Sequence, residues 1–246
     1  MHRFFVPKKN IQGVRGKIDG QELEHLRKVL RLRPGDHITV FDDSGYEHEA
    51  IIRSFAVERC EIEIISSDRI ERESPLDMTL AVGLTKGEKM DFVVEKATEL
   101  GVQVIAPFVS AFTVPKLDND KVERRTARWQ KIALSAAKQS ARSRIPEIRP
   151  LCKFGDFVQQ SFPDGVKLLF WEREEQRTLL DLSREKNNVR SALLVVGAEG
   201  GFNETEANAA REHGFNLMSL GPRILRAETA ALTAVSLVQF LWGDLG

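Results

Sequence analysis

The sequence predicts an α/β protein with a parallel sheet between helices, preceded by a small β-rich domain. From residue 78 onward, apolar runs of strand length alternate with helical segments, as in a sheet covered on both faces. Before residue 70, short strand-like runs are bounded by turn or charged residues. A polar stretch without periodicity, residues 66–77, separates the two patterns. We therefore expect domains at 1–70 and 71–246.

In the first domain, one helix interrupts a series of strands. The strand-like runs are FFVP, VRGKI, HITVF, EAIIRSF and CEIEII. Within residues 21–30, apolar side chains recur at helical spacing, which leaves basic residues on the other side. These apolar residues are Leu23, Leu26, Val29 and Leu30. The pattern is typical of a small β-barrel that contains one helix.

In the second domain, strands and helices alternate. The expected strands are residues 78–84, 102–109, 166–171, 192–197 and 215–220. A helix over 88–100 has a continuous apolar face, and Gly101 follows it where a glycine commonly ends a helix. A second helix over 121–142 carries basic residues at steps of three and four, opposite a face of apolar residues.

Composition excludes several classes of protein. Of the 246 residues, 42% are hydrophobic and 29% are charged, which is ordinary for a folded domain and too polar for a membrane protein. No apolar run reaches the length of a spanning helix, and MHRFFVPKKN lacks a signal-peptide core. Cys60 and Cys152 stand alone and the histidines are scattered. We expect a cytoplasmic protein with no membrane contact, no disulfide and no metal.

The formal net charge is zero, but the charge is unevenly distributed. Residues 1–35 carry nine basic and three acidic groups, residues 36–70 the reverse, and residues 121–149 nine basic and two acidic groups. Like charges on one helix face repel one another, so a polyanion explains the face of 121–142 better than simple solvation does. The candidate RNA-binding residues are Arg3, Arg27, Arg31, Arg33, Arg124, Arg128, Lys138 and Arg142.

Two loops that follow expected strands carry the chemistry. The common phosphate-loop, dinucleotide, hydrolase-elbow and zinc-protease motifs are absent from the sequence. Residues 197–203 hold three glycines in five positions before a helix start, which lets the backbone approach a ligand closely. Residues 220–230 place two arginines and a glutamate around a Gly-Pro turn. An ordinary tight turn and a solvated helix cap are the alternatives.

Four segments carry a family resemblance: LGPRILRAETA, GAEGGFNETE, KGEKMDFVVEKATELGV and RWQKIALSAAKQSARSRIPEI. In this order, behind a basic β-rich domain, they resemble the RsmE family of 16S ribosomal RNA uridine-N3 methyltransferases, in the SPOUT superfamily. The resemblance covers essentially the whole chain. The family usually reads GPEGG, whereas this chain has alanine at position 198. We expect a slightly freer loop and the same function.

The resemblance implies a PUA-like N-terminal domain, a SPOUT domain with a trefoil knot, S-adenosyl-L-methionine as methyl donor, and a homodimer. It also implies that the partner is 16S rRNA, within the small ribosomal subunit. The donor-binding residues would be Phe170, Trp171, Glu172, Gly197, Ala198, Glu199, Gly200, Gly201, Leu220, Gly221, Ile224 and Leu225. A larger side chain at Gly200 is expected to enter the ligand space.

The reaction itself sets the catalytic candidates. The proton on uracil N3 must leave, and the negative charge that spreads over O2 and O4 must be stabilised. Arg226 is the first candidate for that stabilisation, with Arg223 in support. Glu228 or Glu199 would accept the proton or orient an arginine. A methyltransferase for another RNA position and a non-catalytic RNA-binding protein remain the rival readings.

Overall fold

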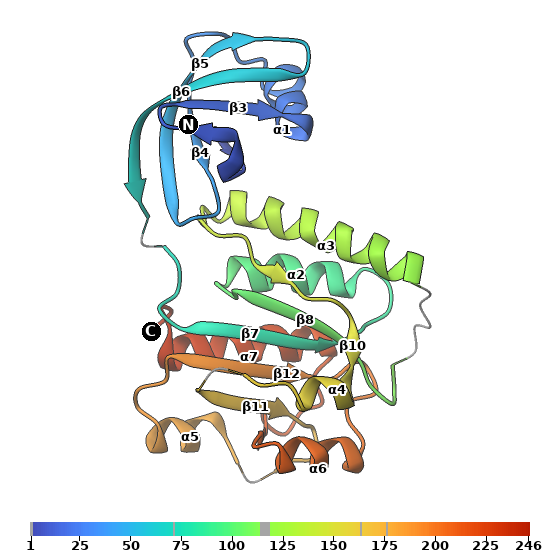
Figure 1. The fold of residues 1–246 in the computed structure, drawn as a ribbon. Helices are drawn as coiled ribbons and strands as arrows, with labels where there is room; N and C mark the ends of the chain where they lie inside the picture. The colour runs from blue at the N-terminus through green and yellow to red at the C-terminus, as the bar shows by residue number, and fades with distance from the viewer. Residues whose placement is uncertain (1, 71, 114–118, 163, 176) are drawn as a thin grey trace. The chain divides into compact units, whose positions relative to one another are not determined.

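The computed structural model describes residues 2–70, 72–113, 119–162, 164–175 and 177–246, which divide into two units (Figure 1). Unit 1 comprises Met1–Glu73 together with Ala137–Ile145, and unit 2 comprises Ser74–Ala136 and Pro146–Gly246. The domain limits expected from the sequence, 1–70 and 71–246, stay a prediction. The sequence pattern did not indicate that a segment beyond residue 136 belongs with the N-terminal unit.

Unit 1 is built on a curled six-stranded sheet with the strand order β1-β4-β5-β6-β3-β2. The β1–β4 pair is parallel and the other pairs are antiparallel. The strands are β1 (Arg3–Phe5), β2 (Ile11–Gln12), β3 (Arg15–Asp19), β4 (His37–Phe41), β5 (Tyr46–Phe55) and β6 (Arg59–Arg69). The helical turns are η1 (Lys8–Asn10), α1 (Gly20–Glu24) and η2 (His25–Val29).

The core of unit 1 follows the predicted alternation. Phe4, Ile18 and Ile38 point inward from three strands and pack with Leu23 and Leu26 of the helical segment. The helix expected over 21–30 changes to a wider π-type turn at η2 and ends before Arg31, whose φ is +56°. One expectation was wrong. Val29 is 67% exposed, because the wider turn rotates it off the apolar face.

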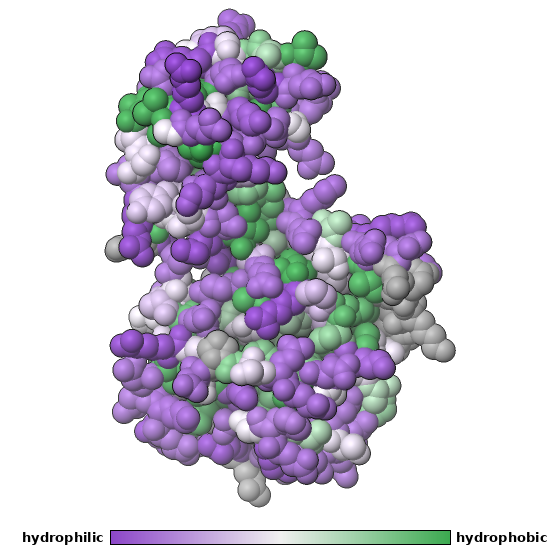
Figure 2. All heavy atoms as spheres, in the orientation of Figure 1, coloured by the Kyte–Doolittle hydropathy of each residue, from purple (hydrophilic) through white to green (hydrophobic). Residues whose placement is uncertain are grey.

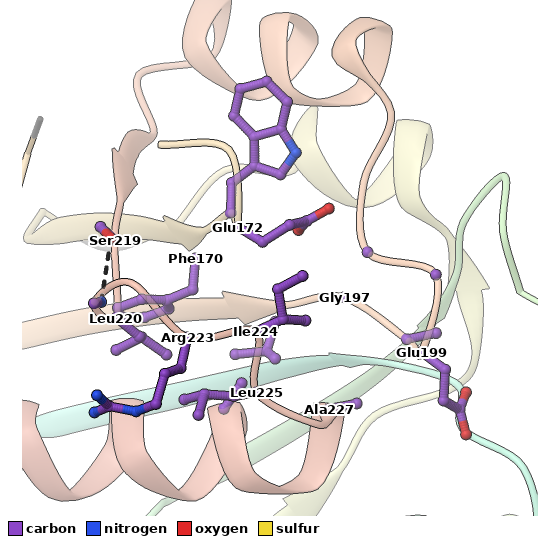
Figure 3. A pocket seen from close by; sticks show the side chains of 17 residues that line it. Phe170, Glu172, Gly197, Glu199, Ser219, Leu220, Arg223, Ile224, Leu225 and Ala227 are labelled. Carbon is purple, nitrogen blue, oxygen red and sulfur yellow. Dashed lines mark hydrogen bonds between the residues drawn. The ribbon is translucent and has the colours of Figure 1, made fainter. Parts of the chain in front are cut away.

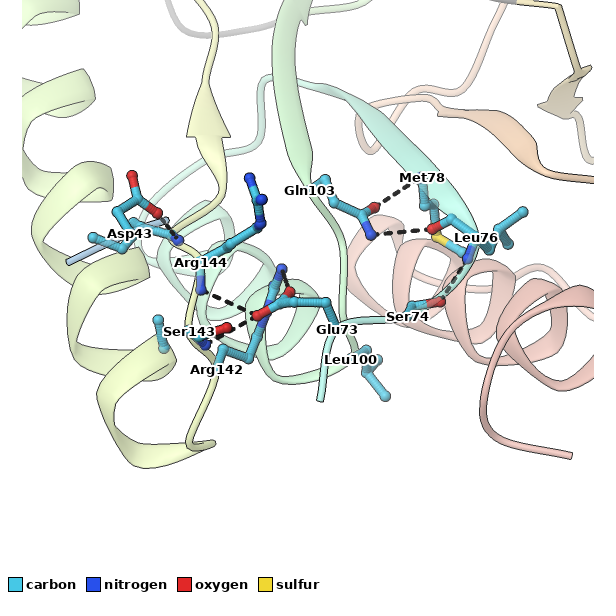
Figure 4. Close-up of polar contacts among 12 residues, drawn as sticks. Asp43, Glu73, Ser74, Leu76, Met78, Leu100, Gln103, Arg142, Ser143 and Arg144 are labelled. Carbon is cyan, nitrogen blue, oxygen red and sulfur yellow. Dashed lines mark hydrogen bonds and ion pairs between the residues drawn. The ribbon is translucent and has the colours of Figure 1, made fainter. Parts of the chain in front are cut away.

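A buried polar cluster attaches residues 137–145 to the rest of unit 1 (Figure 4). The Glu73 carboxylate accepts hydrogen bonds from Arg142 Nε at 3.0 Å and Nη2 at 2.7 Å, and from two backbone N–H groups. Arg142 is 3% exposed. Arg3 donates to the Glu47 carboxylate at 2.6 Å and to the Arg142 carbonyl oxygen at 2.5 Å. Lys138 pairs with Glu22 at 2.7 Å.

These contacts correct part of the predicted RNA-binding face. Helix α3 (Asn119–Gln139) ends three residues earlier than expected, and Ala141 follows with a φ of +59°. The chain therefore turns away from the helix axis, and Arg142 points into unit 1 instead of extending the basic face. Arg3, Lys138 and Arg142 form ion pairs within the unit, so we leave them out of the proposed RNA contacts.

Replacing Arg142 by Met is expected to destabilise the protein strongly. The substitution leaves the Glu73 carboxylate partly buried without its charged partner, and breaking a buried ion pair from one side costs about 3–5 kcal/mol. Urea denaturation of both proteins measures the loss in the free energy of unfolding. Arg144→Met in the same segment is the control, because this exposed side chain can be removed while its N–H bond to Glu73 stays. Equal losses in the two variants would contradict the assignment.

Unit 2 contains a parallel sheet with the order β10-β8-β7-β12-β11-β13, and β9 also pairs with β8. The strands are β7 (Asp77–Gly83), β8 (Val104–Val109), β9 (Glu147–Ile148), β10 (Cys152–Lys153), β11 (Val166–Phe170), β12 (Ser191–Val196) and β13 (Asn216–Met218). The five longer ones coincide, within three residues at either end, with the five expected strands.

Helices cover both faces of this sheet (Figure 1). On one face, α7 packs against β7, β12, α2 and α5; on the other, α4 and α6 pack together over a core rich in phenylalanine. The helices are α2 (Lys89–Glu99), α4 (Phe154–Val158), α5 (Leu179–Glu185), α6 (Glu204–Glu212) and α7 (Ala227–Trp242). The indole N–H of Trp129 on α3 donates to Asp91 of α2 at 3.0 Å, which joins α3 to this layer.

The surface shown in Figure 2 is predominantly hydrophilic, with hydrophobic atoms in small groups among polar ones. Among the described residues, no helix has the length and hydrophobicity needed to cross a membrane.

Candidate functional site

The strand order brings three loops together at the carboxyl edge of the parallel sheet. Strand β11 lies between β12 and β13 and pairs with both in parallel. The loops that follow these strands begin at Trp171, Gly197 and Ser219, and therefore lie side by side. Open α/β sheets bind ligands at this edge. Strand β7 is the other neighbour of β12, so the loop that leads to α2 joins the same group.

A pocket opens among the three loops (Figure 3). All twelve residues proposed to bind the donor line it, and so does Arg223. Four lining residues were not singled out from the sequence: Val196, Ser219, Ala227 and Ala230. Val196 ends β12, Ser219 begins the loop after β13, and Ala227 and Ala230 are in the first turn of α7. These positions could have been found by extending each loop by a residue or by one helical turn.

The glycine loop is tightly packed against its surroundings. Gly201 has a φ of +65°, and its N–H donates to the Ala198 carbonyl oxygen at 2.9 Å. A Cβ at Gly201 would lie 2.7 Å from the Glu172 carboxylate. Asn203 and Glu206 form a reciprocal capping box that begins α6 directly after the loop. The positive φ favours glycine at 201, and a Cβ there would also displace the Glu172 carboxylate.

The expectation for Gly200 was wrong. A Cβ at this position would lie 2.5 Å from the Cβ of Phe112, in the loop after β8. A larger side chain there pushes against Phe112 and not simply into the pocket. A substitution at Gly201 is therefore the better test of the site.

The pocket combines apolar walls with a few polar groups. Phe170 and Leu225 contribute apolar surface, and Ile224 stands 87% exposed in the loop after β13. The Trp171 indole donates to the Phe202 carbonyl oxygen at 3.1 Å, which links the first loop to the second. In Figure 3, Glu172 lies between the loops, whereas the charged ends of Arg223 and Glu199 point away from the other labelled side chains.

Two of the proposed catalytic residues lie outside the pocket wall. Arg226 and Glu228 flank the lining residue Ala227 at the beginning of α7. Arg226 is exposed, and among the described residues no side chain pairs with its guanidinium group. Glu228 is in the first turn of α7, and its side chain is 16% exposed. Both therefore lie next to the pocket without lining it.

Lys89 is a functional candidate that sequence reasoning missed. Its ammonium group lies 3.0 Å from Glu199 Oε1 and 3.8 Å from Glu228 Oε2. Glu199 Oε1 also accepts the Lys86 N–H at 3.2 Å. Partial burial acts to raise the pKa of Glu199, but backbone N–H groups and the Lys89 ammonium outweigh it and hold that pKa below its usual value. One signal could have indicated Lys89: it belongs to the segment KGEKMD, which follows β7, and β7 is a neighbour of β12 in the sheet.

Comparison with known proteins identifies the family. A model of the RNA methyltransferase domain matches residues 72–239, and a model of the RNA methyltransferase PUA domain matches residues 18–65. The ribosomal RNA small subunit methyltransferase E of Bacillus subtilis is 34% identical over 91% of this chain and 89% of its own. This chain belongs to the RsmE family.

Solved structures of RsmE-family size share the whole fold. The ribosomal RNA small subunit methyltransferase E of Neisseria gonorrhoeae, bound to S-adenosyl methionine, is 34% identical and covers 100% of both chains with a TM-score of 0.89. A protein of Legionella pneumophila, also in complex with that compound, is 33% identical and covers 99% of this chain and 98% of its own, with a TM-score of 0.90. The expected SPOUT-type α/β domain and PUA-like domain are confirmed.

The remaining basic residues of this RsmE-family chain differ in their availability. Arg31, Arg33 and Arg124 are exposed. Arg27 donates to the carbonyl oxygens of Ala56 and Val57, so its guanidinium is already engaged. Arg128 pairs with Asp91 at 2.6 Å, although its side chain remains 58% exposed. Lys131, another member of the predicted basic face, is exposed as well.

Proposed function

We propose that this chain transfers the methyl group of S-adenosyl-L-methionine to N3 of a uridine in the 16S ribosomal RNA of the small subunit. The observation that carries the proposal is the pocket at the carboxyl edge of the sheet, formed by the three loops that the family resemblance names. The family membership and the two relatives with bound S-adenosyl methionine support the same assignment.

The residues of the pocket fit this donor. S-adenosyl-L-methionine supplies a methyl group on a positively charged sulfur and presents a flat adenine ring. Leu220 and Leu225 offer apolar surface for such a ring, and the backbone of the two loops offers N–H and C=O groups for its edges. The Glu172 carboxylate, between the loops in Figure 3, suits a positively charged ligand.

The groups beside the pocket fit the chemistry at the base. Arg226 carries a guanidinium group, which would present a planar fork of donors to the uracil oxygens. Arg223 would support it. Of the two carboxylates, Glu199 is already bonded to Lys86 and Lys89, and its lowered pKa makes it a weak proton acceptor. We therefore favour Glu228 as the base.

The exposed basic residues of α3 and of the PUA-like domain would bind the RNA backbone. Replacing both Arg124 and Lys131 by Ala is expected to weaken RNA binding and to lower the salt slope by about two, since each phosphate contact contributes about one. Binding isotherms at several salt concentrations measure the slope. The control replaces Lys96 and Arg184, which removes the same charge from α2 and α5. An unchanged salt slope in the α3 variant would mean that this basic face is solvated and does not contact RNA.

Three further features come with the proposal. We propose a homodimer, which the exposed Leu237 and Phe240 on α7 support, because apolar side chains three apart form one face of a helix. We also propose the trefoil knot of the SPOUT superfamily and action in the cytoplasm, on RNA within the small subunit. Sedimentation of the purified chain tests the dimer.

Methyl transfer to small-subunit RNA tests the function. Donor labelled in its methyl group is incubated with the chain and with RNA or small subunits, and the modified nucleoside is then identified. The expected product is 3-methyluridine at one site. A different methylated nucleoside would indicate another RNA position, and binding without transfer would indicate an RNA-binding protein.

A further inference from the structure

The cluster of Lys89, Glu199 and Glu228 lies directly beside the donor pocket. Glu199 lines the pocket, and Glu228 follows the lining residue Ala227 in the chain. Glu228 Oε2 is buried and accepts no hydrogen bond from the described residues. The Lys89 ammonium lies 3.8 Å from this oxygen. A buried carboxylate oxygen without a donor is unfavourable, so this ammonium is what compensates its charge.

We propose that Lys89 is a positioning residue for methyl transfer, which holds the Glu228 carboxylate beside the pocket as acceptor of the uracil N3 proton. The inference rests on the proposed function. In the step, the N3–H bond breaks and its proton forms an O–H bond with Glu228. N3 uses the freed electron pair to bond the methyl carbon, and the pair of the broken carbon–sulfur bond stays with sulfur.

The charges of the cluster favour this role over anion stabilisation. One ammonium between two carboxylates carries a net charge of −1, which attracts a proton and disfavours a second anion. Lys89 and the Lys86 N–H both donate to Oε1 of Glu199, whereas among the described residues Glu228 has the Lys89 ion pair and no hydrogen bond to its buried Oε2. Stabilisation of the uracil oxygens is thereby left to a different cation, Arg226.

Among the described residues, Lys89 is the charged group that forms an ion pair with Glu228. Glu228 is in the first turn of α7, where the helix dipole favours a carboxylate. The segments of β7 and β12 that pack on α7 are buried and apolar. On α5, the charged residues Asp181, Arg184 and Glu185 pair with each other or with neighbours of their own helix. Glu199, the third member of the cluster, pairs with the same Lys89 ammonium.

Single-turnover methylation with saturating RNA and donor, together with donor affinity, tests the inference. In Lys89→Met, the buried Oε2 of Glu228 loses its charged neighbour, so the carboxylate is no longer held in position. The methylation rate is therefore expected to fall about 10-fold, part of what a general base contributes, while the affinity for S-adenosylhomocysteine stays unchanged. Lys89→Arg keeps the charge and should recover most of the rate.

Two further variants separate positioning from folding. Lys96→Met is the matched control: Lys96 is on the same helix and pairs with Glu95 and Glu99, so its loss should leave the methylation rate unchanged. Glu228→Gln should be slow, and adding Lys89→Met to it should lower the rate no further.

Three outcomes would overturn the inference. The first is a near-normal methylation rate in Lys89→Met, and the second is a near-normal rate in Glu228→Gln. The third is a loss of affinity for S-adenosylhomocysteine in Lys89→Arg and Lys89→Met, which would make Lys89 a support of the donor loop through Glu199. An unmodified chain that transfers no methyl group would overturn the proposed function as well, which distinguishes the two failures.

Discussion

Gly201→Val is expected to abolish binding of the methyl donor, with at least a 100-fold loss of affinity. The backbone at Gly201 has a φ of +65°, which costs a branched side chain about 1–2 kcal/mol or more. In addition, the new Cβ would lie 2.7 Å from the Glu172 carboxylate, so either the loop or Glu172 must move. Both line the pocket. Calorimetry with S-adenosylhomocysteine measures the loss.

Gly221→Ala separates the effect of backbone strain at a positive φ from the effect of a steric clash of the new side chain. Gly221 also has a positive φ, +97°, and lines the same pocket, but a Cβ there would meet no atom within 4 Å. We expect a modest effect on donor affinity from this variant. If Gly201→Val binds the donor as well as the unmodified chain does, the three-loop pocket is not the donor site.

Arg226→Ala is expected to lower turnover by about 100-fold, the scale of losing one donor to an oxyanion. Arg226 precedes Ala227 at the start of α7, with its guanidinium exposed and outside the pocket wall. Charge on the uracil oxygens grows only as the proton leaves, so the interaction strengthens in the transition state. Donor affinity should change little. Single-turnover methylation with saturating RNA and donor measures the rate.

Arg226→Lys serves as the comparison. A point charge replaces the planar fork of donors, so we expect partial recovery of the rate. Near-normal turnover in Arg226→Ala, with weaker RNA binding, would make this arginine a phosphate contact. The stabilising role would then pass to Arg223.

The residues that line the pocket were largely predictable from the sequence, because each of the three loops directly follows a recognisable strand. Each loop follows an apolar strand, and parallel strands end at one edge, so Trp171, Gly197 and Leu220 had to come near each other once β11 lies between β12 and β13. Their roles in binding the donor remain proposals. The clash of position 200 with Phe112 could not be foreseen, because it depends on a contact between loops distant in the sequence.

The ion-pair partners of individual charged residues were not predictable from the sequence. The spacing of basic residues indicated a single basic face through Arg142, but the helix ends at Gln139 and Arg142 meets Glu73, 69 residues earlier in the chain. Lys89 meets Glu199 110 residues away. Such pairs leave no periodic trace, because their spacing is fixed by the tertiary fold and not by the helix repeat.

The attachment of residues 137–145 to unit 1 also sets an order for synthesis. The sheet strands of this unit are complete when Arg69 has been made, but Glu73 meets its arginine only with residue 142, and the segment ends at Ile145. At about 5–20 residues per second, the ribosome needs roughly 4–14 seconds to extend the chain from Glu73 to Ile145. During that interval the nascent N-terminal unit has its strands without its closing segment. A chain cut after Glu73 would remain in that state permanently.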